Sequence, residues 1–382
     1  MTAPGGGPHW RVLLHAADRT GPPMLARALL REVRARRPDV SLDVVCFRGG
    51  EMVEELASIA PATVLLEDHE AWDHGAPVPA RVAALHQATE TLPAADAVLL
   101  VSVAAGQCLP YLARQDRPVV TWVVEQGADL HWLDAPVDVA SRTDVWLAGS
   151  TTTRDELVDR LGPGPDVTVC LEFVEEPAPV PAEVAAARRR ELVGRDDGLL
   201  VVGAGIGTWR KAPDLFLEVA AAAARRESPD HFVWVGGTTD ELHPLVAAER
   251  DRLRLDRLQL VPAVPDLGPT LSAADVLLHP ARLDAFPLVC LHAVLAGTPV
   301  VAFSGAGGVP EMLGDGFVGA PYPDVDGLRR AVDELRDPGR RQEVVARQRA
   351  AVVDRCTARV AAPTVMAALD RATRTDPQGA RA

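Results

Sequence analysis

Residues 202–214 read VGAGIGTWRKAPD, and this stretch decides how the second half of the sequence is interpreted. An apolar run before it predicts a strand, three glycines follow, and Pro213 suits the first position of a helix. Glycines let the backbone approach a bulky anion, while a helix start offers free N–H groups and a positive dipole end. Arg210 and Lys211 add two positive charges there, and Lys211 is the only lysine in the chain. The stretch therefore predicts a diphosphate-binding loop, although a glycine-rich loop alone also fits a plain tight turn.

Two further loops follow predicted strands in the same half. Residues 282–292 read RLDAFPLVCLH and come after an apolar run that ends at residue 279. Residues 305–311 read GAGGVPE and come after a run that ends at residue 303. Ligands of open α/β sheets bind at the carboxyl ends of the strands, where these loops would lie. Asp284 is thus predicted either to accept hydrogen bonds from sugar hydroxyls or to cap the helix that follows it.

Short apolar runs alternate with helical patterns along the whole sequence. Predicted strands lie at 11–17, 42–47, 63–66, 97–103, 119–124, 145–148, 199–202, 232–235, 258–262, 276–279 and 300–303. Predicted helices lie at 23–36, 78–91, 152–161, 214–226, 244–255, 288–295, 325–335 and 366–374. Strands that are apolar on both faces and separated by helices are typical of parallel, doubly wound α/β sheets.

A Pro- and Glu-rich stretch at 172–183 interrupts this alternation and is interpreted as a linker. We therefore predict two Rossmann-like domains, at 1–175 and 184–360. A closing helix at about 361–375 is expected to pack back on the first domain, and the tail from Thr375 is expected to be disordered.

Composition excludes several classes of partner and compartment. The net charge of −14 argues against nucleic acid, because phosphate backbones need a basic surface. Arginines at 31–37 predict a solvated basic helix face or, alternatively, weak docking to an anionic membrane. No apolar run reaches the roughly 18 residues of a membrane-spanning helix, and no secretory signal is evident. Five scattered cysteines without CxxC spacing favour reduced thiols, so we expect a cytoplasmic protein without a zinc cluster.

The region from Gly203 to Glu311 carries a family resemblance. Its Trp209-Arg210-Lys211 run, the run DAFPLV at 284–289 and the glycines at 305–308 resemble the retaining glycosyltransferases of family 4. This group is typified by bacterial polysaccharide and natural-product enzymes. The short run DRTGP at 18–22 is similar to the glycine loop of the same group. The resemblance implies a GT-B fold, in which an N-terminal acceptor domain and a C-terminal nucleotide-sugar donor domain face a central cleft.

The resemblance also implies a role for individual residues. Arg210 and Lys211 would neutralise the diphosphate, and Asp284 would hold the donor sugar. The remaining donor contacts would come from Gly21, Gly205, Gly207, Val264, Phe286, Pro287, Leu288, His292, Gly307, Gly308 and Glu311. Charge develops on the leaving diphosphate, so fixed cations and amides there would supply most of the catalysis. No metal or other cofactor is expected, since no Asp-x-Asp run stands where it would hold one.

Two positions depart from the family pattern. His292 stands where an acid ordinarily holds the ribose hydroxyls, although an imidazole can make similar hydrogen bonds. Glu125 follows the fifth predicted strand without its usual neighbouring histidine and is a candidate polar contact or base near the acceptor. His131 is a candidate replacement for that histidine or an exposed loop residue, and His15 is a candidate acceptor contact.

The sequence therefore predicts transfer of a hexose or aminohexose, with retention, from a UDP-linked donor to a hydroxyl of a small-molecule natural product or glycan. Two alternatives stay open: a nucleotide-sugar epimerase of the same architecture and a nucleotide-sugar-binding protein that has lost catalysis. The acceptor, the nucleotide and the oligomeric state are not specified by the sequence.

Overall fold

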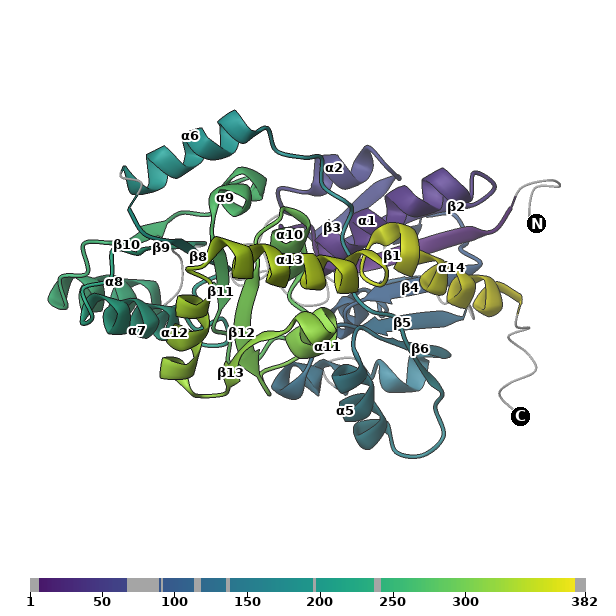
Figure 1. Ribbon diagram of the computed structural model, residues 1–382. Coiled ribbons are helices and arrows are strands. Elements are labelled where there is room, and N and C mark those ends of the chain that lie inside the picture. Colours follow the sequence, from purple (N-terminus) through teal and green to yellow (C-terminus); the bar gives the residue numbers. More distant parts are fainter. Residues whose placement is uncertain are drawn as a thin grey trace, which may run out of the picture. The chain divides into compact units, whose positions relative to one another are not determined.

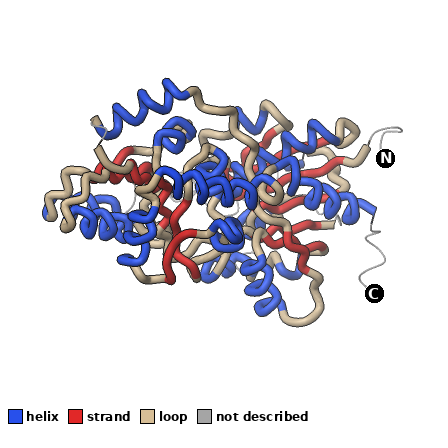
Figure 2. Tube along the Cα trace, in the orientation of Figure 1, coloured by secondary structure: helices blue, strands red, loops and turns tan. Residues whose placement is uncertain are grey.

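The computed structural model describes residues 7–66, 89–90, 92–112, 118–134, 138–194, 197–236 and 242–374. The chain forms two compact units, one from Met1–Glu175 with Ala358–Ala382 and one from Glu176–Thr357. The first passage between the units lies inside the Pro- and Glu-rich stretch 172–183, and the second lies at Thr357–Ala358. In each unit the strands gather between helices (Figures 1 and 2).

The sheet of the first unit has seven parallel strands in the order β3-β2-β1-β4-β5-β6-β7. Its strands are β1 (His9–Ala16), β2 (Ser41–Arg48), β3 (Ala62–Leu66), β4 (Ala97–Val101), β5 (Val119–Val123), β6 (Val145–Ala148) and β7 (Val167–Val169). The central strands are buried on both faces, as their unbroken Val and Leu runs predict. The strand order reverses at β1 and β4, which places the carboxyl ends of these two strands at a position where open sheets bind ligands.

Among its described residues, the first unit has the helices α1 (Gly21–Arg36), α2 (Val53–Ala57), α5 (Thr151–Leu161) and α14 (Ala358–Arg374), with 3₁₀ helices η1 (Val103–Cys108), η2 (Gly127–Leu133) and η3 (Ala140–Arg142). Helix α1 has Pro22 and Pro23 in its first turn, where proline is tolerated, and buries a face that includes Leu25 and Leu29. Helix α14 packs against α1 and β4, so the end of the chain completes the first unit (Figure 1).

The basic face of α1 is occupied within the unit. Its arginines contact acids or carbonyls at hydrogen-bonding distance: Arg31 with Glu175 (3.0 Å), Arg34 with the Ile59 carbonyl (3.0 Å), Arg36 with Glu32 (2.8 Å) and Arg37 with Asp370 (2.8 Å). These contacts neutralise much of the charge that membrane docking would use. Whether this face also contacts a membrane stays a prediction.

The sheet of the second unit has six parallel strands in the order β10-β9-β8-β11-β12-β13. Its strands are β8 (Leu200–Ala204), β9 (His231–Val235), β10 (Leu258–Val261), β11 (Val276–His279), β12 (Val300–Ser304) and β13 (Val318–Pro321). The core includes Phe216, whose ring lies edge-on to Phe232 at 5.8 Å and to Trp234 at 5.5 Å between centroids. Strands β8, β11 and β12 are neighbours, so the loops that follow them meet at one edge.

The helices of the second unit are α6 (Ala182–Val193), α7 (Pro213–Ala224), α8 (Leu242–Arg252), α9 (Gly268–Ala273), α10 (Leu288–Leu295), α11 (Val309–Leu313), α12 (Val325–Glu334) and α13 (Pro338–Val353), with η4 at Gly314–Gly316. Helix α7 starts at Pro213, and the residue before it, Ala212, adopts a left-handed conformation with φ of 58°. This turn lets the chain leave the glycine loop and enter the helix directly.

Several elements differ from the sequence predictions. Strand β4 ends at Val101, because Ser102 has a φ of 85° and starts the 3₁₀ helix η1. Helix α14 begins at Ala358, eight residues before the predicted start at Met366. Elements β7, β13, α2, α6, α9, α11 and α13 were not predicted. Of the helix predicted at 78–91, only residues 89–90 are described, and the tail from Thr375 lies outside the described residues.

In the part of the chain that the structure describes, no helix has the length and apolarity to cross a membrane.

Candidate functional site

Three loops from neighbouring strands build the candidate site in the second unit. The first follows β8 and carries Arg210 and Lys211, and the second follows β11 and carries Asp284. The third follows β12 and carries Gly307 and Gly308. Because the strands are parallel, all three loops leave the same edge of the sheet, where ligands of this class of fold bind.

The start of the β8 loop depends on two glycines, Gly205 in the loop and Gly236 just after β9. Gly205 has a φ of 145°, which side-chain-bearing residues rarely adopt, and its N–H donates to the Val235 carbonyl at 3.0 Å. At Gly236, at the end of the neighbouring strand, an added Cβ would lie only 1.7 Å from the Gly205 carbonyl oxygen. The close approach of these two backbones fixes the start of the loop. Gly207, a third glycine of the loop, is buried.

The Asp284 carboxylate is the centre of the site. It pairs with the Lys211 ammonium through Oδ2, and the Arg210 guanidinium lies 3.5 Å from Oδ1. The His279 Nε2 atom lies 3.0 Å from Oδ2 in a contact whose angles fall short of a hydrogen bond. Asp284 is only 6% exposed. The sequence predictions for Arg210, Lys211 and Asp284 therefore converge on one point in space, which sequence spacing alone does not reveal.

The protonation states of this cluster follow from burial and charge. Burial alone would raise the pKa of Asp284, but the Lys211 charge and the His279 contact hold that pKa well below its usual range. Burial lowers the pKa of His279, against the opposing effect of Asp284, so the ring is neutral at neutral pH. Burial also raises the pKa of the nearby Cys290 thiol well above its usual value. Two cations thus face one carboxylate, which leaves one net positive charge for an anionic ligand.

The backbone of Asp284 is held against the third loop. Its N–H donates to the Ala306 carbonyl at 2.8 Å, and Gly308 N–H donates to the Ala285 carbonyl at 3.0 Å. Gly307 has a φ of 138°, and an added Cβ would lie 1.8 Å from the Asp284 carbonyl oxygen. Glycine is therefore required at 307 for the two loops to touch. Asp284 does not cap α10, whose N-cap residue is Pro287.

Arg282 braces the first loop from the second. Its N–H donates to the Arg210 carbonyl at 2.8 Å, and its guanidinium donates to the Trp209 carbonyl at 2.9 Å. It also forms a two-bond pair with Asp214 at the start of α7 and stacks 5.1 Å from the centre of the Trp209 ring. These contacts keep Arg210 and Lys211 in place before any ligand binds.

The other residues expected to contact the donor from the second unit lie on several of its loops and helices. Phe286 and Pro287 are buried, while Leu288 begins α10 and His292 lies half-buried one turn further along that helix. Glu311 is half-buried on the short helix α11. Val264 is half-buried in the loop after β10. The roles that the sequence predicts for these residues stay predictions.

The predicted acceptor residues belong to the first unit. The Glu125 carboxylate, after β5, accepts a hydrogen bond from Ser102 and further bonds from the N–H groups of Val124 (3.0 Å) and Val103 (3.3 Å). Burial raises the pKa of Glu125 despite the opposing Ser102 bond. Ser102 was not selected from the sequence, and its positive φ is a backbone strain of the kind that collects at functional sites.

The remaining three candidates of the first unit have different surroundings. His15 is half-buried near the end of β1, its pKa is lowered by burial, and its Nδ1 has no hydrogen-bond partner among the described residues. Gly21 begins α1, and an added Cβ there would meet nothing within 4 Å. His131 is exposed on η2 and its Nδ1 lies 2.8 Å from the Ala128 carbonyl, as expected for a loop residue.

Sequence reasoning missed His279 and Arg282 as parts of the site. A histidine at the end of a predicted strand, five residues before Asp284, is the signal that could have indicated His279. Within the described residues, no three His, Cys, Asp or Glu side chains are grouped as metal ligands.

Comparisons with known proteins place this site within a matched region. Residues 196–337, which include all three loops, match the family model described as Glycosyl transferases group 1. The D-inositol 3-phosphate glycosyltransferase of Kribbella flavida is 34% identical over 218 residues, which cover 53% of this chain and 51% of the relative. The GDP-mannose-dependent alpha-(1-6)-phosphatidylinositol monomannoside mannosyltransferase of Mycolicibacterium smegmatis is 28% identical over 232 residues, 56% of this chain and 60% of the relative. The chain thus spans about half the length of the first curated relatives it matches.

Among solved structures, HepE of Anabaena in complex with UDP-glucose superposes with a TM-score of 0.77 at 18% identity. The superposition covers 95% of this chain and 99% of HepE. Together with the two parallel sheets, this likeness shows that the chain has the GT-B fold.

Proposed function

We propose that this GT-B chain, whose residues 196–337 form a glycosyl transferases group 1 domain, is a glycosyltransferase that takes its donor from a nucleotide-diphosphate sugar. The observation that carries the proposal is the buried Asp284 carboxylate with Lys211 and Arg210 against it, at the carboxyl edge of the matched domain. A carboxylate and two cations match a ligand that has sugar hydroxyls at one end and a diphosphate at the other.

In this proposal the bound donor takes over some of the contacts that Asp284 makes with Lys211 and Arg210 in the free protein. Lys211 and Arg210 contact the diphosphate, and Asp284 accepts hydrogen bonds from the sugar hydroxyls. Because Lys211 is already held by Asp284, its ammonium needs little reorganisation when the leaving diphosphate gains charge. Arg282 supports this geometry by fixing the loop backbone at Trp209 and Arg210.

The reaction needs no added reactant. The bond between the anomeric carbon and the diphosphate oxygen breaks, and the acceptor hydroxyl oxygen forms the new bond to that carbon. The hydroxyl proton leaves with the departing diphosphate, so atoms and charge balance. We infer retention of the anomeric configuration and no metal requirement, both from the family resemblance.

For the substrates we infer a UDP-linked hexose or aminohexose and a hydroxyl of a small molecule or glycan. The UDP-glucose in the HepE complex supports a uridine donor, and the name of the Mycolicibacterium relative makes GDP-mannose the donor to test beside it. The names of the Kribbella and Mycolicibacterium relatives support a phosphorylated polyol or its lipid as one acceptor class to include. Glu125 is our candidate contact to the acceptor hydroxyl. We infer a cytoplasmic location from the scattered, odd-numbered cysteines of the sequence, which lack CxxC spacing.

The test is calorimetric binding of UDP, GDP and their sugars in the presence of a metal chelator, followed by transfer assays with and without acceptors. We expect one nucleotide to bind, with its sugar, and acceptor to accelerate donor loss. Lys211→Ala should abolish both, whereas the matched control Arg225→Ala, an exposed residue after α7, should change neither. Interconversion of the sugar without acceptor would instead identify an epimerase. Binding without turnover over the acceptor panel would identify a binding protein, and no binding at all would reject the site.

A further inference from the structure

A pocket lies in the same unit at the opposite ends of the strands from the candidate site. Leu199 comes just before β8, Asp230 just before β9 and Asp275 just before β11, so these residues mark the amino edge of the sheet. The pocket has a volume of about 580 Å³ and is lined by Arg189, Gly198, Leu199, Asp275, Arg336 and Arg341. This size is in the range of small-molecule sites in proteins. Three of its six lining residues are arginines, in a chain whose net charge is −14.

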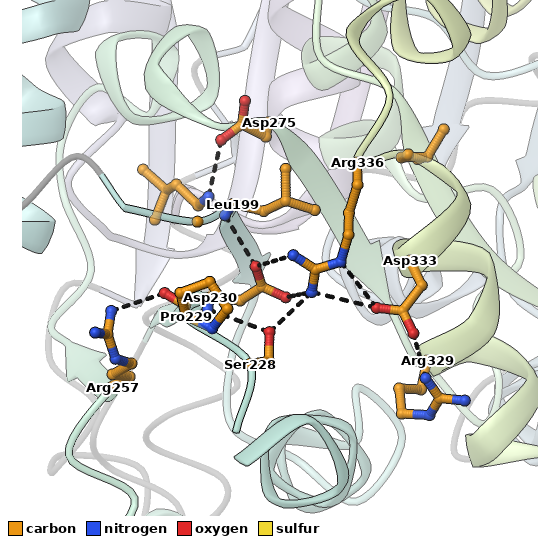
Figure 3. Close-up of polar contacts among 12 residues, drawn as sticks. Leu199, Ser228, Pro229, Asp230, Arg257, Asp275, Arg329, Asp333 and Arg336 are labelled. Atoms are coloured by element: carbon orange, nitrogen blue, oxygen red, sulfur yellow. Dashed lines mark hydrogen bonds and ion pairs between the residues drawn. The ribbon is translucent and has the colours of Figure 1, made fainter. Parts of the chain in front are cut away.

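Two aspartates hold the frame of this pocket. Asp275 accepts hydrogen bonds from the Leu200 N–H and from Arg189, both at 2.8 Å. Asp230 accepts from the Leu199 N–H at 2.9 Å and from Arg336 at 3.0 Å. Figure 3 shows Asp230 and Asp333 on two sides of the Arg336 guanidinium, with Ser228 beside it. These carboxylates cap strand ends and fix Arg189 and Arg336, so both guanidiniums are already positioned.

Arg341 differs from the other two lining arginines in which hydrogen-bond donors of its guanidinium remain unused among the described residues. Its Nη1 donates to the Leu335 carbonyl at 2.7 Å and to the Arg336 carbonyl at 3.0 Å, which anchors the group after α12. Its Nη2 lies 3.4 Å from Asp275 Oδ1 without forming a hydrogen bond, and its Nε has no partner among the described residues. Nε and Nη2 form the edge that Arg11 uses to bind both oxygens of Asp43. The anchored guanidinium thus lines the pocket, and its Nε–Nη2 edge, beside the Asp275 carboxylate, retains hydrogen-bonding capacity.

Charge favours an anion at this edge. The three lining arginines face Asp275 in the wall and Asp230 behind Arg336, which leaves one net positive charge there. Asp333, which is not a lining residue, divides its carboxylate between Arg336 and Arg329. The two-donor edge of arginine matches two oxygens of a phosphate or carboxylate, and a doubly charged phosphate gains most from several guanidiniums.

We propose that this pocket binds a small phosphate monoester, whose phosphate is held by the Nε–Nη2 edge of Arg341 with Arg336 and Arg189 beside it. The volume exceeds what a bare phosphate fills, so the pocket has room for an organic group attached to the phosphate. The pocket lies at the other end of β8 and β11 from Lys211 and Asp284, so this ligand is neither the donor nor its leaving group. The proposal does not depend on the proposed transferase activity.

The test measures phosphate binding in a protein whose donor site is disabled. In a Lys211→Ala background, isothermal titration with glycerol 3-phosphate and with inorganic phosphate should show one site, with the monoester at least as tight. Adding Arg341→Gln should weaken binding by about tenfold or more, as expected for losing charge-assisted hydrogen bonds. Arg341→Lys keeps the charge but not the two-donor edge and should recover only part of the affinity. Arg340→Gln, the neighbouring arginine that pairs with Glu343, is the matched control and should leave binding unchanged.

Arg341 also caps two carbonyls, so unfolding midpoints of each variant establish that the comparison is made on folded protein. If the Arg341→Gln and Arg340→Gln variants bound the phosphate ligands with equal affinity, the assignment to this pocket would be overturned. Absence of any phosphate binding in the Lys211→Ala background would do the same. Tighter binding of inorganic phosphate than of the monoester would make the ion itself the ligand and refute the monoester class.

Discussion

Replacing Asp284 by asparagine changes the charge of the candidate donor site while keeping its shape. In the free protein this carboxylate pairs with Lys211 and lies 3.5 Å from the Arg210 guanidinium. Asparagine retains one carbonyl oxygen but no charge, so the net charge at the site rises by one. The substitution therefore separates two roles that the geometry gives to Asp284, holding sugar hydroxyls and balancing the cations.

The cost in stability can be worked from these contacts. Each hydrogen bond to a charged group contributes about 1.5–3 kcal/mol, and one oxygen still accepts, so we expect a loss of about 2 kcal/mol. In a unit of this size such a loss lowers the melting temperature by roughly 4–8 °C. Because the folded pKa of Asp284 is depressed, its stabilisation is present above the unfolded pKa and is lost as pH falls towards the folded value. The difference between the two proteins should therefore shrink in acid.

Asp284→Asn should change nucleotide binding and sugar transfer in opposite directions. Bare nucleoside diphosphate should bind Asp284→Asn as tightly as wild type or more tightly, because Lys211 no longer shares its charge with a carboxylate. Transfer should fall by about 10- to 100-fold, which corresponds to the loss of one charged hydrogen bond to a sugar hydroxyl. The assay pairs calorimetry of the nucleoside diphosphate with steady-state transfer, and Asp315→Asn, an exposed aspartate of the same unit, is the control. Equal losses of nucleotide binding and transfer would refute the assignment of Asp284 to the sugar.

The remaining predictions concern the other residues of both units. Lys211→Arg should restore only part of the turnover lost in Lys211→Ala, because a planar guanidinium does not reproduce the compact ammonium that pairs with Asp284; full recovery in steady-state kinetics would contradict this. Gly307→Ala should lower the unfolding free energy by about 2 kcal/mol or more and abolish donor binding, since its Cβ would overlap the Asp284 carbonyl. A melting curve identical to that of the wild type would count against the contact between the two loops. Burial raises the pKa of Glu125 in the folded protein, so the free energy of unfolding falls as pH rises through that pKa. Glu125→Gln should reduce this fall in stability between acid and neutral pH. Parallel stability–pH curves for the two proteins would show that the carboxyl is not buried.

Much of the fold could be predicted because its central elements have strong local signals. The ranges of β11 and α10 match their predictions residue for residue, since unbroken apolar runs and the Phe286-Pro287 helix start leave little choice. The edge strands β7 and β13 were missed, because they are only three and four residues long and each carries at most one buried residue. Helices α6 and α13 were also missed, since their arginine-rich sequences lack a continuous apolar face.

The sequence by itself determined the doubly wound α/β class, the glycine loops and the residue types of the donor site, because these depend on neighbours along the chain. Only the tertiary structure decided that Lys211 and Asp284, 73 residues apart, form one pair, and that His279 stands beside them. It also decided that Arg189, Arg336 and Arg341 line one pocket at the opposite edge. The physical reason is the order of the parallel sheet. It places β8 beside β11, although β9 and β10 lie between them in the sequence, and so brings distant loops together. Local preferences create the loops, while the hydrogen-bonded order of the whole sheet determines which loops meet.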